Sequence, residues 1–285
     1  MNQRIVGLVL HSDYESVKHQ TDHLVERLAQ DGVAARVIDC ALKPIDFEVL
    51  PELIVVLGGD GTILKAAEFT HELSVPLLGF NLGRVGFLAE AEISDISVVV
   101  DAIVNKTWSP ETRIMLEISV ERDGKSVYSS FAVNEIAIEK VSRELMTELR
   151  VSVDGSPLMA WAGDGIVVST PTGSTAYAFS AGGPVIWPTA NVLLAVPISA
   201  HALFAKPIVV APESEVGVEV LSAAAMATLD GRRRTDLVHG DIIRVTKSST
   251  TLRFARVHST SFTERLVAKF RLPTVGWREM REDHA

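Results

Sequence analysis

The chain has 285 residues and a mass of 30.9 kDa, a length that favours two domains. Apolar residues make up 47% of it and charged residues 22%, a globular composition that excludes disorder as the main interpretation. The 36 acidic residues against 27 basic ones give a net charge of −9, which argues against a nucleic-acid-binding protein with a basic face. A small anionic ligand stays compatible with this charge, because backbone N–H groups and a divalent cation can bind phosphates.

The sequence indicates a reducing compartment. Cys40 is the only cysteine, so neither an intrachain disulfide nor a C-x-x-C motif can form. The first ten residues show no signal-peptide pattern, and the longest apolar stretch, residues 192–205, is too short to span a bilayer. We therefore expect a cytoplasmic protein without a membrane partner.

Strands and helices alternate in the first part of the chain. Four short apolar runs have the character of buried strands. They are residues 5–10, 33–38, 53–57 and 76–80. Helical spacing of apolar residues predicts helices at 16–30 and 63–69 between them. This alternation predicts an α/β domain over residues 1–107, with a parallel sheet covered on both faces.

The pattern changes near Trp108. From Arg113 onward, apolar and polar residues alternate in short runs, as in half-buried strands. Asp123-Gly124 and Asp154-Gly155 predict hairpin turns between these runs. We expect residues 108–260 to form a mostly antiparallel, β-rich domain.

Helical spacing returns at residues 262–270, near the end of the chain. Leu266, Val267 and Phe270 give this helix an apolar face that needs burial. We therefore expect the C-terminal helix to return to the first domain, which then comprises residues 1–107 plus 261–285.

Two patterns in the first part of the chain are incomplete. Gly59-Asp60-Gly61 begins the G-x-G-x-x-G of dinucleotide-dependent dehydrogenases, but Leu64 stands in place of the third glycine. A hydride-transferring enzyme is therefore disfavoured. His19 and His23 are spaced for one helical face, but the sequence nearby offers no third ligand, so we expect an exposed face and no metal site.

The strongest feature of the sequence is the segment LIVVLGGDGT, from Leu53 to Thr62. A buried strand here leads glycines and an acid into a helix N-terminus, and ligands of doubly wound sheets bind at the carboxyl ends of strands. The glycines let the backbone approach a diphosphate, and the helix offers it unpaired N–H groups. Asp60 would lie beside the phosphates, as a base or near Mg²⁺. Alternatively, Asp60 caps an ordinary helix-entry turn, and the loop alone does not decide between the two.

A second block runs from Gly163 to Pro184, where a strand passes into small, hydroxyl-bearing and glycine residues interrupted by Tyr177. The hydroxyl and amide groups can bind phosphate and ribose, and the tyrosine can pack on a ring. The alternative is a flexible Ser/Thr/Gly loop, but such loops rarely place an aromatic residue directly after a buried strand.

The third motif is Asn134-Glu135, two polar residues inside an otherwise apolar β run. Buried polar groups need partners. An amide beside a carboxylate suits a nucleoside, with Asn134 on a base edge and Glu135 accepting from ribose hydroxyls. Alone, such a pair at a strand end is more often solvated than functional.

Together the three motifs resemble the NAD kinase family, which is marked by a Gly-Gly-Asp-Gly-Thr loop, an Asn-Glu pair and a long Asp-Gly…Ser-Thr-Pro-Thr-Gly-Ser-Thr-Ala-Tyr block in this order. The resemblance covers nearly the whole chain, and residues 262–270 are similar to the tail of bacterial members. The glycine loop also occurs in diacylglycerol and sphingosine kinases, whereas the block over residues 169–183 is highly specific.

The resemblance implies an enzyme that phosphorylates the 2′-hydroxyl of the adenosine ribose of NAD to give NADP, with Asp60 as proton acceptor. The donor would be ATP or also polyphosphate, together with Mg²⁺ or another divalent cation. The phosphate donor would lie along the glycine loop. The residues expected to bind the nucleotides are Gly58, Gly59, Gly61, Thr62, Lys65, Phe87, Asn134, Glu135, Asp164, Thr172, Thr175, Ala176, Tyr177, Ala178, Phe179 and Ser180.

The resemblance also bears on assembly and specificity. Asp164 would face the nicotinamide ribose near a subunit boundary, so a homodimer or homotetramer is expected. Ala162-Gly163 stands where some members carry an arginine, which leaves the choice between NAD and NADH open. Asp230-Gly231 resembles a family position near the nicotinamide. Two alternatives are a lipid kinase, which would share only the glycine loop, and a non-catalytic NAD sensor, which would not need Asp60.

Overall fold

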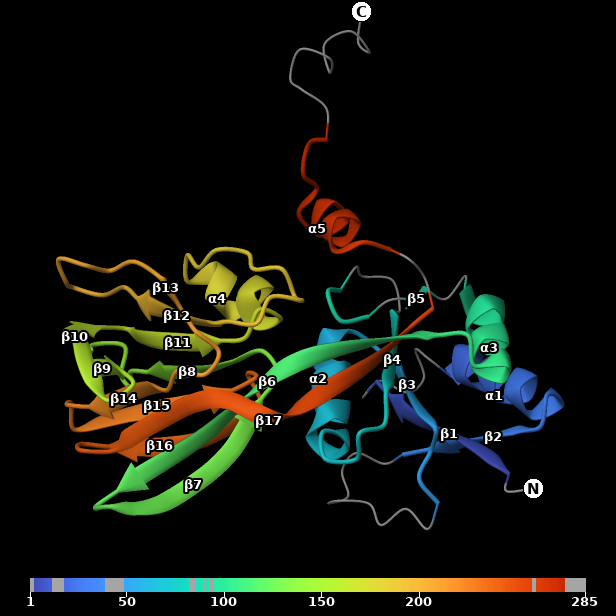
Figure 1. Ribbon diagram of the computed structural model, residues 1–285, viewed down its shortest axis with the longest axis horizontal. Coiled ribbons are helices and arrows are strands. Elements are labelled where there is room, and N and C mark those ends of the chain that lie inside the picture. The colour runs from blue at the N-terminus through green and yellow to red at the C-terminus, as the bar shows by residue number, and fades with distance from the viewer. Residues whose placement is uncertain are drawn as a thin grey trace, which may run out of the picture. The chain divides into compact units, whose positions relative to one another are not determined.

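The computed structural model describes residues 3–11, 18–38, 49–81, 86–89, 91–92, 95–257 and 260–274. Cys40 and residues 275–285 lie outside these ranges. The contacts divide the chain into two compact units (Figure 1). Unit 1 comprises Met1–Glu111 and Arg253–Ala285, and unit 2 comprises Thr112–Leu252.

Parallel strands form the centre of unit 1, in the order β2, β1, β3, β4 (Figure 1). Their bounds are Arg4–Leu10 for β1, Val33–Val37 for β2, Leu53–Leu57 for β3, Leu77–Asn81 for β4 and Ala91–Glu92 for the short β5 that pairs with β4. All five residues of β3 are buried, because this strand lies between β1 and β4 in the middle of the sheet. A continuous apolar run is typical of such a strand.

Helices cover both faces of this sheet, as the sequence pattern predicted. Within its described ranges, unit 1 contains α1 at Lys18–Gln30, α2 at Asp60–Thr70, α3 at Ile96–Asn105 and α5 at Phe262–Phe270. Apolar residues of α1 and α3 form one core cluster with Val55 and Phe80 of the sheet. Ile63 of α2 lies against Gly79, which faces the opposite side of β4 from Phe80. Each helix in the described ranges is too short or too polar to span a lipid bilayer.

Unit 2 consists of antiparallel strands, which confirms the predicted β-rich architecture. Its elements are β6 at Ser109–Arg122, β7 at Lys125–Ala132, β8 at Glu135–Glu139, β9 at Thr147–Val153, β10 at Ser156–Gly163, β11 at Gly165–Ser169, a 3₁₀ turn at Gly173–Thr175, α4 at Tyr177–Ser180, β12 at Leu193–Ile198, β13 at Ile208–Val210, β14 at Val216–Val220, β15 at Ala224–Leu229, β16 at Arg233–Val238 and β17 at Ile242–Arg256. By their bounds, β6 and β17 contribute residues to both units.

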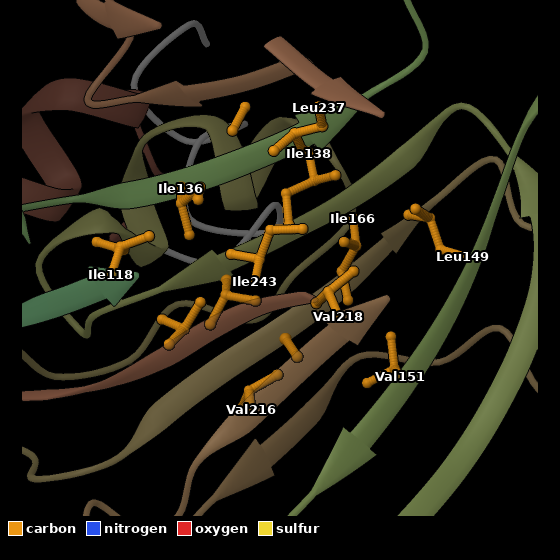
Figure 2. Close-up of a cluster of buried hydrophobic side chains, with 14 of the residues drawn as sticks. Ile118, Ile136, Ile138, Leu149, Val151, Ile166, Val216, Val218, Leu237 and Ile243 are labelled. Atoms are coloured by element: carbon orange, nitrogen blue, oxygen red, sulfur yellow. The ribbon is translucent and has the colours of Figure 1, made fainter. Parts of the chain in front are cut away.

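Two layers of strands enclose the core of unit 2. One is a sheet in the order β13, β12, β11, β8, β15, β16, and the other contains β10, β9, β14 and β17. Figure 2 shows Ile138 and Ile166 from the first layer beside Val218 and Ile243 from the second. Burial of these branched side chains holds β8 in place, and β8 begins at Glu135.

Asp-Gly pairs make the hairpin turns at the predicted places. Asp123-Gly124 joins β6 to β7 with φ values of 51° and 73°, and Asp154-Gly155 joins β9 to β10 with values of 52° and 74°. Positive φ at both central residues is what a tight hairpin between twisted strands requires. Asp230-Gly231 makes a third such turn, between β15 and β16, with φ values of 52° and 65°.

The C-terminal helix α5 belongs to unit 1, as expected. It begins with a capping box, in which the Ser261 hydroxyl accepts from the Glu264 N–H and the Glu264 carboxylate accepts from the Ser261 N–H. The predicted apolar face is only half-buried at Leu266 and Val267. Phe270, the third residue of that face, and Phe262 pack their rings against Phe87.

Candidate active site

The glycine loop leads from β3 into α2. Gly59 is the N-cap residue of α2, and Asp60 is its first helical residue. A Cβ atom added at Gly58 would overlap the Thr62 side chain, so this position needs glycine. A Cβ atom at Gly59 or Gly61 would meet no atom of the described residues within 4 Å. The two later glycines therefore leave open space at the helix N-terminus, where N–H groups attract an anion.

The Asp60 carboxylate is held by consecutive backbone N–H groups of a loop that follows β4. Oδ2 accepts from Phe87 N at 3.0 Å, and Oδ1 accepts from Leu88 N at 3.1 Å and from Ala89 N at 3.4 Å. The helix has no side-chain cap, so the alternative that Asp60 caps α2 is wrong. A carboxylate offers about four lone-pair positions, and three bonds leave room for one further donor.

The loop that holds Asp60 is itself anchored within unit 1. The Phe87 ring packs against Phe262 and Phe270 of α5, with ring centroids 5.9 Å and 5.8 Å away. Arg256 Nη1 donates to the Leu88 carbonyl at 3.0 Å. The same guanidinium binds the Glu111 carboxylate through two further hydrogen bonds, of 3.0 Å and 3.1 Å. These contacts fix the N–H groups that orient Asp60.

Gly86 contributes to this arrangement, and our sequence interpretation missed it. A Cβ atom at this position would overlap the Asp60 carboxylate. Only a glycine lets the loop approach closely enough to bind Asp60. Two other residues expected at the site, Thr62 and Lys65, lie in the first turns of α2, Thr62 buried and Lys65 half-buried.

The Asn134-Glu135 pair lies at the start of β8 in unit 2. The two residues are only 8% and 6% exposed, so the interpretation of a solvated pair is wrong. Their backbone N–H groups donate to the buried carboxylate of Asp230, at 2.7 Å from Asn134 and 3.4 Å from Glu135. The N–H of Val133 donates to the same carboxylate at 3.0 Å.

The surroundings of Glu135 favour its neutral form. Burial, and after it the Asp230 charge, raise the pKa of Glu135 to about 8, while a hydrogen bond from the Tyr177 backbone acts in the opposite direction. Glu135 Oε2 is buried and has no hydrogen-bond partner within the described part of the chain. A neutral carboxyl group can donate as well as accept, so Glu135 has hydrogen-bonding capacity to offer a ligand.

The hydroxyl groups at the start of the long block serve the fold. Ser169 Oγ donates to the Asn134 carbonyl at 3.2 Å, and Thr170 Oγ1 donates to the Val133 carbonyl at 2.7 Å. A Cβ atom at Gly173 would overlap the Asn134 carbonyl oxygen. The block therefore packs directly against the Asn134-Glu135 pair, and its first hydroxyls are not free for phosphate or ribose, contrary to our expectation for this segment.

The other residues expected in this block differ in exposure. The Thr172 hydroxyl accepts from the buried Arg113 guanidinium at 3.3 Å. Thr175, Ala176 and Tyr177 are half-buried, Phe179 and Ser180 are exposed, and the Ala178 side chain is fully buried in a core cluster. Ala178 can therefore face a ligand through its backbone only.

Glu139 and Lys140, at the end of β8, each bind a residue that was expected to contact the nucleotides. Tyr177 donates its hydroxyl to Glu139 Oε1 at 2.6 Å. Lys140 Nζ lies 2.6 Å from Asp164 Oδ1, and this hydrogen bond holds the pKa of Asp164 below its ordinary value, with a second bond from Ser199. The adjacent residues Glu139 and Lys140 thus orient an aromatic ring and a carboxylate, which the sequence alone did not indicate.

Two family models match this chain. The model of the ATP-NAD kinase N-terminal domain matches residues 14–108, and that of the ATP-NAD kinase C-terminal domain matches residues 133–257. NAD kinase 2 of Streptomyces coelicolor is 45% identical over 291 residues, which cover 96% of this chain and 97% of the relative.

Two solved structures are similar in fold. The crystal structure of an NAD kinase from Archaeoglobus fulgidus in complex with ATP has a TM-score of 0.76 at 28% identity, covering 95% of this chain and 100% of that one. The crystal structure of yeast NADH kinase complexed with NADH has a TM-score of 0.83 at 24% identity, covering 96% of this chain and 89% of that one.

Because the pKa of Glu135 is raised, the free energy of unfolding should depend on pH. Between the ordinary value of 4.5 and about 8, the unfolded chain has lost this proton while the folded protein keeps it. The free energy of unfolding therefore falls across this range as pH rises. Glu135→Gln removes the titration, so the variant should gain stability relative to the wild type from about pH 5 to about pH 8.

Urea denaturation at several pH values measures this difference in the free energy of unfolding. Glu148→Gln, at an exposed position of the same unit, is the matched control. A difference between Glu135→Gln and the wild type that stays constant with pH would contradict the assignment of a neutral Glu135.

Proposed function

Because the chain belongs to the NAD kinase family, we propose that Asp60 is the proton acceptor when the 2′-hydroxyl of the adenosine ribose of NAD is phosphorylated by ATP. The reaction itself follows from family membership, and the protein is a phosphotransferase. The observation that supports this role is the position of the Asp60 carboxylate. Asp60 follows the central strand β3, and three backbone N–H groups hold its carboxylate in place.

In this reaction the 2′-oxygen of NAD forms a bond to the γ-phosphorus of ATP, and the bond from that phosphorus to the leaving oxygen of ADP breaks. The proton of the 2′-hydroxyl passes to the Asp60 carboxylate. Phosphoryl transfer has a loose transition state, so alignment of the hydroxyl contributes more than the strength of the base. Three hydrogen bonds to Asp60 supply that alignment on the protein side.

The glycine loop is proposed to bind the phosphates of the donor. Support comes from the open space at Gly59 and Gly61 beside the N-terminus of α2. Thr62 and Lys65 lie in the same helix and would add a hydroxyl and a positive charge. Polyphosphate carries the same phosphate chemistry, and NADP formation measured with each donor distinguishes the two.

A divalent cation bound to the donor would neutralise the charge on the phosphate oxygens. The residues that the structure describes include no group of three or more His, Cys, Asp or Glu side chains that could hold such an ion. We propose that oxygens of the donor phosphates bind the cation, because Mg²⁺ in kinase sites is bound in part by substrate phosphates.

The β-rich domain, proposed to span residues 108–260, would bind the dinucleotide, and residues 1–107 plus 261–285 would carry the glycine loop. Asn134 and Glu135 would contact the adenosine half, because both are buried beside the long block. Thr172, Tyr177 and its neighbours would complete that contact. Asp164 would face the nicotinamide ribose, and Phe87 would line the site next to Asp60.

The comparisons give no support to a lipid kinase or to a non-catalytic sensor, since the family models and relatives that match are NAD kinases. Cytoplasmic location and assembly into a homodimer or homotetramer remain proposals. The single cysteine supports the first, and the family resemblance around Asp164 supports the second.

Asp60→Asn should remove the proton acceptor while keeping the shape of the side chain. We expect turnover to fall by about 10²–10⁴. NAD should still bind, because its proposed contacts lie mainly in other segments. The measurement pairs NADP formation with calorimetry of NAD binding on the same sample. Near-normal turnover would exclude Asp60 as the acceptor.

Gly86→Ala tests whether the loop must approach Asp60 closely. The added methyl group overlaps the carboxylate, so the loop has to shift and Asp60 loses its alignment. Turnover should fall by about 10² with NAD affinity retained. The midpoint of thermal unfolding serves as the control for folding. Normal turnover in a folded variant would show that the three N–H bonds are not needed.

Asn134→Ala should remove a contact made equally in the ground state and the transition state. The KM for NAD is therefore expected to rise while kcat changes little. Asn191→Ala, at an exposed asparagine of the same unit, is the matched control. An unchanged KM for NAD in Asn134→Ala would place Asn134 outside the dinucleotide site.

A further inference from the structure

A buried ion pair in the β15–β16 hairpin takes no part in the proposed chemistry. Asp230 is 6% exposed, and its carboxylate lies 2.8 Å from Arg233 Nη2. Asp230 has φ of 52°, in the left-handed region, where an aspartate is tolerated in a tight turn. The turn aims the carboxylate at the segment that precedes β8, 97 residues away in the sequence.

The Asp230 carboxylate is the acceptor for the N–H groups of Val133, Asn134 and Glu135. These donors lie where β8 begins, and buried N–H groups must find an acceptor. A charged acceptor gives shorter and stronger bonds than a carbonyl, which agrees with the 2.7 Å bond from Asn134. With three N–H groups and a guanidinium bound, this carboxylate has little capacity left for a ligand.

Arg233 links the Asp230 carboxylate to β7, the strand that precedes Asn134 and Glu135. Its Nη1 donates to the Ser130 hydroxyl at 3.0 Å, and its guanidinium lies 4.1 Å from the centre of the Phe131 ring. The planar fork of arginine suits such a set of simultaneous contacts, which the single ammonium of lysine cannot make. Arg233 also compensates the buried charge of Asp230, which would otherwise be costly.

We propose that Asp230 and Arg233 are positioning residues that hold Asn134 and Glu135 in the arrangement that binds the adenosine half of NAD. They set the affinity for NAD through the backbone of the pair. This inference rests on the proposed function of Asn134 and Glu135. It gives Asp230 a role within the protein, whereas the family resemblance only placed Asp230-Gly231 near the nicotinamide.

The test measures steady-state kinetics with NAD and ATP varied separately, on Arg233→Ala, Arg233→Lys and Asp230→Asn. Loss of the guanidinium should raise the KM for NAD about tenfold or more, while the KM for ATP stays within about twofold. Arg233→Lys retains the charge and should recover part of the loss. In Asp230→Asn, the amide NH₂ would face backbone donors, so the KM for NAD should rise as well.

Arg234→Ala is the matched control, because Arg234 is an exposed arginine next to Arg233 on the same strand. It should leave both KM values unchanged. A merely structural role for the pair would lower the amount of active enzyme and thus kcat, with both KM values as in the wild type. That result would overturn the proposal, and so would loss of folding in all three variants.

Direct calorimetry of NAD binding separates this inference from the proposed function. If the wild type forms no NADP but binds NAD, the proposed activity fails, and the affinity of the variants still tests the inference. If the wild type is active and Arg233→Ala binds NAD normally, only the inference fails.

Discussion

In each of the two units, one carboxylate accepts hydrogen bonds from three consecutive backbone N–H groups. Asp60 binds the N–H groups of residues 87–89, and Asp230 binds those of residues 133–135. Segments that leave a strand lose the partners that a sheet would give their N–H groups, and a carboxylate replaces several of them at once. The position of both candidate site segments depends on this one kind of interaction.

The same interaction has different consequences in the two places. Asp60 is half-buried beside open space at a helix N-terminus, so its remaining acceptor capacity can reach a substrate hydroxyl. Asp230 is buried and paired with Arg233, so its capacity is used within the protein. One carboxylate is therefore placed for chemistry, and the other for holding the residues that bind. Exposure and the neighbouring cation make the difference.

Much of this could be predicted from the sequence. The apolar run of β3 and the glycines after it located Asp60, and the Asp-Gly pairs located two hairpins. The hydrogen-bond partners of Asp60 and Asp230 could not be predicted, because they lie in segments distant along the chain. Nor could the sequence tell that the Ser169 and Thr170 hydroxyls bind backbone carbonyls, since a hydroxyl group serves a fold or a ligand equally well.

The protonation state of Glu135 also could not be predicted from the sequence. As a strand-end carboxylate it was expected to accept from ribose hydroxyls, but its burial and the nearby Asp230 favour the neutral form. Burial and a second carboxylate are properties of the folded chain. The helix α5 shows the same limit, because the spacing of its apolar residues did not indicate that Phe262 and Phe270 would pack against Phe87.

A crystal structure with NAD bound tests the role of Asp60 most directly, because it gives the distance from the 2′-oxygen of the adenosine ribose to the Asp60 carboxylate. We expect this distance to lie within hydrogen-bond reach, about 2.6–3.2 Å, with the three N–H bonds to Asp60 kept. A 2′-hydroxyl that lies beyond that reach and donates to another side chain would contradict the assignment of Asp60 as the proton acceptor.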